Sequence, residues 1–196
     1  MKYYLEITLI DGGDEPLYFI WSKLYAQLHL ALVEVKNHND KSNIGVSFPE
    51  YRFNEEKGIG FLGTKLRLFA NSDNELHNLN INSWLARLSD YLHITSIREV
   101  STHKITGHAT FSRKQVKTNA DRLARHRVKR GDIDFDEALK RYQNVVTMSN
   151  LPFIQLKSLT NQHPFRLFIQ KENKIDAENG GFNSHGLSVD ATVPEF

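Results

Sequence analysis

The sequence predicts a mixed α+β fold, because it contains two kinds of segment. In some, bulky residues occupy every second position, as in strands; in others, apolar residues recur every three to four positions, as in helices. Over roughly the first hundred residues the order is strand, helix, strand, strand, helix, strand. Turns rich in glycine, proline and asparagine separate these segments. The order is typical of a ferredoxin-like βαββαβ domain, which we place at residues 1–100. A second domain is expected at residues 101–196.

Each element of the first domain follows from its local pattern. The first helix has one apolar face that includes Trp21, Leu24 and Leu28. The second helix begins at Ser72, where Glu75 completes the spacing of a capping box. A loop around residues 58–60 is expected before the third strand. The expected strands are 3–10, 44–48, 65–70 and 93–100, and the expected helices are 18–35 and 73–88.

The second half contains a strongly basic stretch, residues 112–130, with eight Lys and Arg residues against one acid, whereas the whole chain carries a net charge of +2. At helical spacing one side of the helix is basic, and Gly131 ends the helix. The residues on that side are Arg122, Arg125, His126, Lys129 and Arg130. A solvated surface helix would usually mix charges for pairing one turn apart. A one-sided cationic helix therefore favours nucleic acid as partner. A further helix is expected at 134–144, with strands at 153–156 and 165–170.

Composition narrows the classes of function. The chain of 196 residues has no cysteine and no long apolar run, and we expect a cytoplasmic protein without disulfides, thiolate zinc sites or membrane contact. Its nine histidines form no HExxH motif, and neither of the common phosphate-binding glycine loops is present. We therefore expect no metal and no cofactor. Metal-independent RNA cleavage stays possible, because the RNA 2′-hydroxyl is itself a nucleophile.

Four residues are candidates for chemistry besides the basic stretch. His29 lies at the edge of the apolar face of the first helix, and Ser158 lies in a polar loop between two strands. His185 stands among three glycines, where a side chain can be presented to a cleft. Phe165 could stack on a base. The alternatives are a packed surface histidine, a turn serine, a structural loop residue and a core aromatic.

Six segments of the sequence resemble a known family, the CRISPR repeat-processing endoribonucleases of the type I-F (Csy) system. They occur in the same order and span nearly the whole chain. The segments are QLHLALVE around residue 29, IGVSFP at 44–49, SRKQVKTNADRLARHR at 112–127, LPFIQLKS at 151–158, QHPFRLFI at 162–169 and GGFNSHGLS at 180–188.

The resemblance implies a ferredoxin-like N-terminal domain followed by a divergent ferredoxin-like C-terminal domain that carries an arginine-rich helix. It also implies a sequence-specific, metal-independent endoribonuclease that cuts the precursor transcript at the 3′ base of each repeat hairpin. Such an enzyme leaves a 2′,3′-cyclic phosphate and stays bound to its product. The expected partners are therefore the CRISPR repeat hairpin RNA, as precursor and as mature crRNA, and the other subunits of the type I-F surveillance complex.

The resemblance also assigns roles to individual residues. His29 matches the catalytic histidine, Ser158 the serine that orients the 2′-hydroxyl, and Phe165 the aromatic residue that stacks at the base of the stem. Arg113 and Gln115 match the pair that reads bases. The other RNA-binding residues expected along the basic stretch are Lys117, Asn119, Arg122, Arg125, His126, Lys129 and Arg130.

His185 departs from the family pattern, which often has a tyrosine beside the catalytic histidine. Because imidazole titrates near neutral pH, His185 is a candidate general acid opposite His29. The alternative is that it only orients His29. For the whole chain, a non-catalytic ferredoxin-like protein that binds RNA hairpins is the rival interpretation, and a helix-turn-helix DNA-binding protein is a third.

Overall fold

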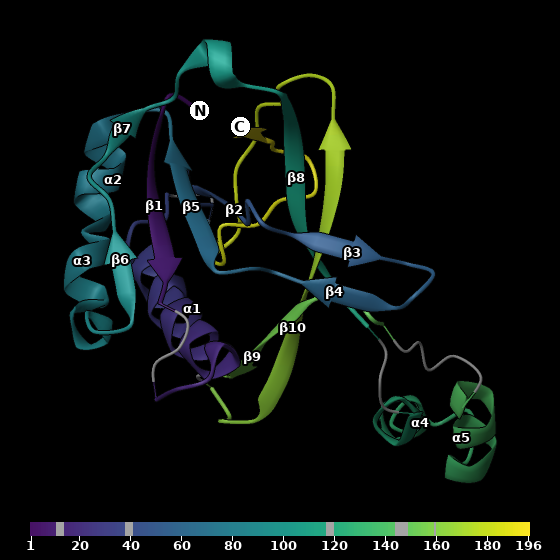
Figure 1. The fold of residues 1–196 in the computed structure, drawn as a ribbon. Coiled ribbons are helices and arrows are strands. Elements are labelled where there is room, and N and C mark those ends of the chain that lie inside the picture. The colour runs from purple at the N-terminus through teal and green to yellow at the C-terminus, as the bar shows by residue number, and fades with distance from the viewer. Residues whose placement is uncertain (11–13, 38–40, 117–119, 144–148, 159) are drawn as a thin grey trace. The chain divides into compact units, whose positions relative to one another are not determined.

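The computed structural model describes residues 1–10, 14–37, 41–116, 120–143, 149–158 and 160–196 (Figure 1). These residues form two compact units, Met1–Arg113 with Leu151–Phe196, and Lys114–Asn150. The larger unit contains the β-sheets, and the smaller unit contains two helices. The predicted domain boundary at residue 100 lies inside the larger unit and does not coincide with the boundary between the two units. The division into two domains therefore stays a prediction.

The first sheet has the strand order β2-β5-β1-β6, with β7 also paired to β1, and its described pairs are antiparallel. Helices α1 and α2 pack against it, and α3 contacts α1. The α+β class is thus confirmed, and the order of elements is the expected one. The bounds are β1 Tyr3–Leu9, α1 Leu17–Glu34, β2 Gly45–Ser47, β5 Lys65–Ala70, α2 Asp73–Leu79, α3 Ile81–Trp84, the 3₁₀ helix η1 Ala86–Leu88, β6 Leu92–Ile94 and β7 Arg98–Glu99.

Alternation along β1 explains which face of this sheet is buried. Leu5, Ile7 and Leu9 are buried, whereas Glu6 points to the other face. There the Glu6 carboxylate accepts a hydrogen bond of 2.7 Å from Arg67 Nε, and Arg67 also donates to the backbone oxygen of Phe196 at 2.8 Å. Burial is the largest single influence on the pKa of Glu6 and would raise it. The hydrogen bond and positive charge of Arg67, together with the charge of Lys65, outweigh burial and hold the pKa below its usual value. The end of the chain is thus attached to the polar face of the first sheet.

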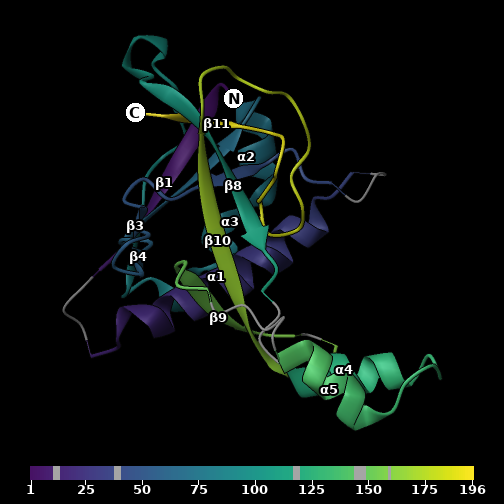
Figure 2. The ribbon, with the colours of Figure 1, turned by 90° about the vertical axis from the view of Figure 1, so that its right-hand side faces the viewer.

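The second sheet has the order β11-β8-β10-β9, and β8 and β10 lie side by side in Figure 2 although they are far apart in sequence. It shares one hydrophobic core with the first sheet. The Ser22 hydroxyl of α1 donates to the Gln155 carbonyl of β9 at 2.5 Å, so that strand lies directly on α1. The bounds are β8 Gly107–Lys114, β9 Phe153–Lys157, β10 Pro164–Lys174 and β11 Val193–Glu195.

The structure corrects several sequence-based boundaries. The prediction of a loop before the third strand is wrong, because β3 Arg52–Asn54 and β4 Ile59–Phe61 form a hairpin there. The expected strand 93–100 is interrupted between β6 and β7, where the Thr95 hydroxyl accepts a hydrogen bond from the Glu6 backbone. Strands β8 and β11 were not predicted, and β10 runs four residues beyond the predicted end.

The smaller unit consists of α4 Ala120–Val128 and α5 Phe135–Gln143, joined by a turn in which Gly131 has a φ of +81°. The two helices contact each other through small residues, with Ala124 and Ala138 fully buried. Arg127 forms an ion pair with Asp132 across the turn. No helix in the described ranges is long and apolar enough to span a lipid bilayer.

The packing around Gly45 gives a test of the core. A Cβ atom at Gly45 would lie 2.6 Å from Phe182 Cζ and 2.7 Å from Val193 Cγ1, and both of those side chains are buried. We expect Gly45→Ala to lower the free energy of unfolding by about 1–3 kcal/mol in urea denaturation, because overpacking strains a filled core. Gly107→Ala is the control, since its nearest neighbour would be 4.0 Å away. Equal stability of both variants would contradict this packing.

Candidate active site

The site begins with His29, which lies half-buried on α1 next to Leu28, a fully buried residue of the core. Its Nδ1 atom is 2.7 Å from the backbone carbonyl oxygen of Ser184. Because a carbonyl oxygen only accepts hydrogen bonds, Nδ1 must carry a proton and donate it. In the neutral ring this leaves Nε2 with the free lone pair. His29 is therefore oriented as a base that acts through Nε2.

The carbonyl that orients His29 belongs to a loop, residues 180–188, that is anchored on the first domain. Phe182 and Ser42 exchange two backbone hydrogen bonds, of 2.8 and 2.9 Å, and Val46 donates to the Gly186 carbonyl at 2.9 Å. Gly186 has a φ of +71°, and a Cβ there would lie 2.2 Å from Val46 Cγ2. Only glycine fits this position without a shift of β2 or the loop.

Within this loop the Asn183 side chain holds the turn in shape. Its Oδ1 accepts hydrogen bonds from the backbone N–H groups of His185 at 2.8 Å and of Leu187 at 3.3 Å. The Tyr25 hydroxyl, from α1, donates to the His185 carbonyl at 2.9 Å. Hydrogen bonds to its N–H and its carbonyl therefore hold the backbone of His185, and this fixes where its ring begins.

The rings of His185 and His29 stack with centroids 4.2 Å apart and planes inclined by 15°. The pKa of His185 is lowered to about 3, mainly by burial and in addition by the positive charges of His29, Arg113 and Lys36. Two charged imidazolium rings at this distance would repel each other in a partly desolvated place. The pair therefore carries at most one positive charge near neutral pH, and His185 is its neutral member.

Arg113 connects this pair with the predicted stacking residue. Its guanidinium lies over the Phe165 ring at 5.4 Å from the centroid, and its charge is near enough to act on His185. The Gln155 side chain donates to the Phe165 backbone carbonyl at 3.1 Å. The structure thus brings His29, His185, Arg113 and Phe165 into one part of the larger unit.

Ser158 lies directly after β9, the strand that packs on α1. Its N–H donates to the His163 carbonyl at 2.9 Å, and its carbonyl accepts from the Gln162 N–H at 2.8 Å. Both hydrogen bonds close the turn between β9 and β10. The described contacts therefore show Ser158 in a turn role, and an interaction between its hydroxyl and His29 is not among them.

The predicted residues of the basic stretch belong mostly to the smaller unit. Gln115, Arg125, His126, Lys129 and Arg130 are exposed in it. The last two lie beyond the end of α4, in the turn before Gly131, and not on the helix as predicted. Lys117 and Asn119 lie outside the described residues, as does the side chain of Arg122.

Three groups that orient the two histidines were not predicted from the sequence. They are the Ser184 carbonyl, the Tyr25 hydroxyl and the Asn183 side chain. Only Asn183 gave a usable signal, because asparagine before a glycine turn commonly accepts backbone hydrogen bonds. Tyr25 falls on the apolar face of the first helix, a pattern that predicts packing and not a hydroxyl contact, and a backbone carbonyl has no signature in a sequence. No group of three or more His, Asp or Glu side chains within the described ranges could hold a metal ion.

Comparison with known proteins gives full-length matches. The family described as CRISPR-associated protein (Cas_Csy4) matches residues 4–196. The chain is 36% identical over 198 residues to a CRISPR-associated endonuclease Cas6/Csy4 of Pseudomonas aeruginosa, and 32% identical to the Escherichia coli protein of the same name. Both alignments cover 100% of each chain. A solved Cas6-related protein from Pyrococcus furiosus is far more distant, at 12% identity and a TM-score of 0.36 over 99% of this chain and 98% of that one.

The titration of His185 tests the geometry of the stack. A free imidazole titrates near pH 6.5, whereas burial and three nearby positive charges hold the pKa of His185 far lower. We expect its ring signals in an NMR titration to stay those of the neutral form from pH 8 down to about pH 5. His185→Gln identifies the signals by their loss.

The lowered pKa of His185 also determines how the stability of the protein changes with pH. Below pH 6.5 the unfolded chain binds a proton at residue 185 that the folded chain does not bind. This contribution therefore lowers the free energy of unfolding as the pH falls from about 6.5 toward the folded-state value. A His185 signal that titrates near pH 6.5 in the folded protein would contradict the buried stack.

Proposed function

The chain belongs to the Cas_Csy4 family of CRISPR-associated proteins, and from that premise we propose that it is an endoribonuclease that processes CRISPR precursor RNA. Its substrate is the repeat hairpin, which it cuts at the 3′ base of the stem. The observation that carries this proposal is the hydrogen bond from His29 Nδ1 to the Ser184 carbonyl. It leaves Nε2 of a half-buried histidine free to accept a proton.

The reaction uses the nucleophile that RNA carries. His29 Nε2 removes the proton of the 2′-hydroxyl, and the 2′-oxygen attacks the adjacent phosphorus. The bond from phosphorus to the 5′-oxygen breaks, which gives a 2′,3′-cyclic phosphate and a 5′-oxygen that takes up a proton. No step needs a metal ion. A positioned general base contributes roughly 10²–10⁴-fold to such a rate.

The low pKa of His185 favours a supporting role over that of general acid. With a pKa of about 3, the charged form amounts to roughly one molecule in 10⁴ at pH 7. The neutral ring instead packs on His29 and excludes water from one face, while its backbone is held by Asn183 and Tyr25. We therefore assign to His185 the positioning of His29, and the departing 5′-oxygen takes its proton from solvent.

Ser158 is the proposed partner of the 2′-hydroxyl before attack. Its support is its place in the chain, since it directly follows the strand that lies on the helix carrying His29. A hydroxyl there would accept or donate a hydrogen bond to the nucleophile and hold it in line with the phosphorus. Because the RNA strand itself completes this arrangement, the turn contacts of the free protein are compatible with the role.

Arg113 and Gln115 are proposed to read base pairs at the foot of the stem. Arginine pairs with guanine O6 and N7, and glutamine with adenine N6 and N7. A duplex RNA major groove is normally too deep and narrow for this, but it opens at the end of a short stem. The stacking of Arg113 on Phe165 supports the assignment, because it holds the planar guanidinium in place beside the ring on which a base would stack.

The exposed cations of the smaller unit are proposed to bind the phosphate backbone of the hairpin. The described members are Arg125, His126, Lys129 and Arg130, and the sequence adds Lys117, Asn119 and Arg122. Backbone contacts of this kind dominate affinity and weaken with salt. They would also keep the enzyme on its product, as a subunit that assembles with other proteins of the type I-F surveillance complex.

The function is tested by single-turnover cleavage of a repeat hairpin RNA in EDTA. We expect the wild-type chain to cut it and to leave a 2′,3′-cyclic end, and a 2′-deoxy substitution at the cut site to abolish cleavage without loss of binding. His29→Ala should bind nearly normally and cut at least 100-fold more slowly.

Lys57→Ala, at an exposed turn of the β3–β4 hairpin, is the matched control and should cut at the wild-type rate. If wild type binds the hairpin tightly but never cuts it, the chain is the non-catalytic RNA-binding protein of the rival interpretation. Cleavage by His29→Ala at the wild-type rate would remove His29 from the mechanism.

A further inference from the structure

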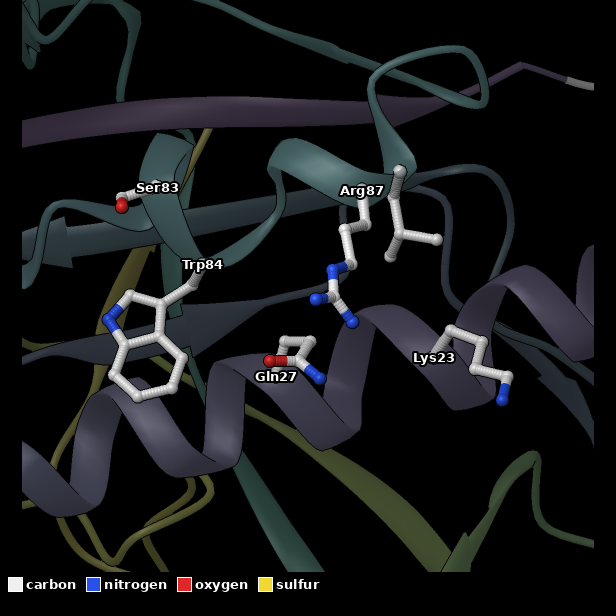
Figure 3. A pocket seen from close by; sticks show the side chains of 6 residues that line it. Lys23, Gln27, Ser83, Trp84 and Arg87 are labelled. Atoms are coloured by element: carbon white, nitrogen blue, oxygen red, sulfur yellow. The ribbon is translucent and has the colours of Figure 1, made fainter.

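A groove lies on the far side of α1 from His29. It occupies about 560 Å³ between α1 and the segment formed by α3 and η1, and is lined by Lys23, Gln27, Ser83, Trp84, Arg87 and Leu88 (Figure 3). All six residues belong to the larger unit. A volume of this size is in the usual range for small-ligand sites.

The groove is separate from the candidate active site. Successive residues of a helix are about 100° apart, so Gln27 lies roughly 160° around α1 from His29. His29 faces the 180–188 loop, whereas Lys23 and Gln27 face α3 and η1. A ligand in the groove would therefore not touch the reacting atoms, and a strand could occupy both places only by passing around the helix.

The charge of the groove is one-sided. Two cations line it and no carboxylate does. Within the described part of the chain neither Lys23 nor Arg87 forms an ion pair, and the contact recorded for Lys23 is with the Phe19 ring, 5.1 Å from its centroid. Figure 3 shows the Arg87 guanidinium directed toward Gln27, with Trp84 and Lys23 on either side. Such a site favours an anion.

Trp84 adds an aromatic surface to these charges. It is half-buried, with part of its ring packed against the core and part facing the groove. Trp21, the other tryptophan, is buried and donates from Nε1 to the Gly63 carbonyl at 3.0 Å. A flat aromatic ring next to free cations is the combination that binds a nucleotide, whose base stacks and whose phosphate pairs.

We propose that this groove binds an unpaired nucleotide, with the base on Trp84 and the phosphate between Arg87 and Lys23. The Gln27 amide is placed to hydrogen-bond the edge of the base or the sugar. Two sources offer this chemistry: an RNA strand that continues beyond the hairpin, which rests on the proposed function, and a free nucleoside phosphate, which does not. An apolar peptide segment is disfavoured, because it would bury two cations without a partner.

The fluorescence of Trp84 tests the proposal directly, because base stacking quenches an indole. An adenylate oligonucleotide, adenosine 5′-monophosphate and inorganic phosphate are added separately to the full chain. We expect the oligonucleotide to quench, and the quench to disappear in Trp84→Phe. Quenching by the monophosphate at similar concentrations identifies a free nucleotide as ligand, and quenching by the oligonucleotide alone identifies a strand.

Affinity gives the second measurement. Trp84→Ala should weaken binding of the quenching probe by about five- to a hundred-fold, the value of one lost stacked base, and Arg87→Ala should weaken it through the lost phosphate contact. If the ligand is a strand, they should also reduce the affinity for a hairpin with a single-stranded extension, but not for the hairpin alone. Lys57→Ala is the control and should change neither.

The outcomes separate this inference from the proposed function. If wild type cuts the hairpin but no probe quenches Trp84, or if Trp84→Ala binds every probe as wild type does, the groove is not a nucleotide site. If the two variants change only the association of the chain with a second protein, the groove is a protein-binding surface and the proposal is wrong. Quenching without hairpin cleavage would support the groove and overturn the proposed function alone.

Discussion

The hydrogen bond between His29 and the Ser184 carbonyl decides what the candidate site can do. A neutral imidazole can carry its proton on either nitrogen, and its partner makes the choice. Here the partner is a backbone carbonyl 155 residues away in the sequence. Its position depends on the backbone pairs that attach Phe182 to Ser42 and Gly186 to Val46. The reactive nitrogen of a helix residue is therefore selected by how the 180–188 loop packs on Ser42 and Val46.

The same packing sets the electrostatics of the site. Stacking of His185 on His29 places two titratable rings together where burial and Arg113 disfavour a second positive charge. One ring therefore stays neutral and supports the other. Because Arg113 also stacks on Phe165, the proposed base-reading residue and the histidine pair share one electrostatic environment. The positive charge of Arg113 therefore acts at the place where the His29 ring is oriented by the Ser184 carbonyl.

Much of the first domain could be predicted, because its strands and helices carry strong periodic patterns. Strand β8 was missed since Ala109 and Thr110 are buried on successive positions, so the strand shows no polar alternation. Strand β11 contains Pro194, which disfavours strands except at a sheet edge, where β11 lies. His29 was a candidate from its place at the edge of an apolar helix face, and the family resemblance gave it the catalytic role. Nothing in the local sequence could indicate its carbonyl partner. The groove beside Trp84 was missed because its two walls are more than fifty residues apart.

The tautomer of His29 tests the account most directly. Nitrogen chemical shifts of its imidazole, measured by NMR in the free protein above pH 7, distinguish a protonated Nδ1 from a protonated Nε2. We predict the form with the proton on Nδ1, and Gly186→Ala should disturb it, because displacement of the loop moves the Ser184 carbonyl. A His29 that carries its proton on Nε2 in the neutral form would contradict the assignment of Nε2 as the base.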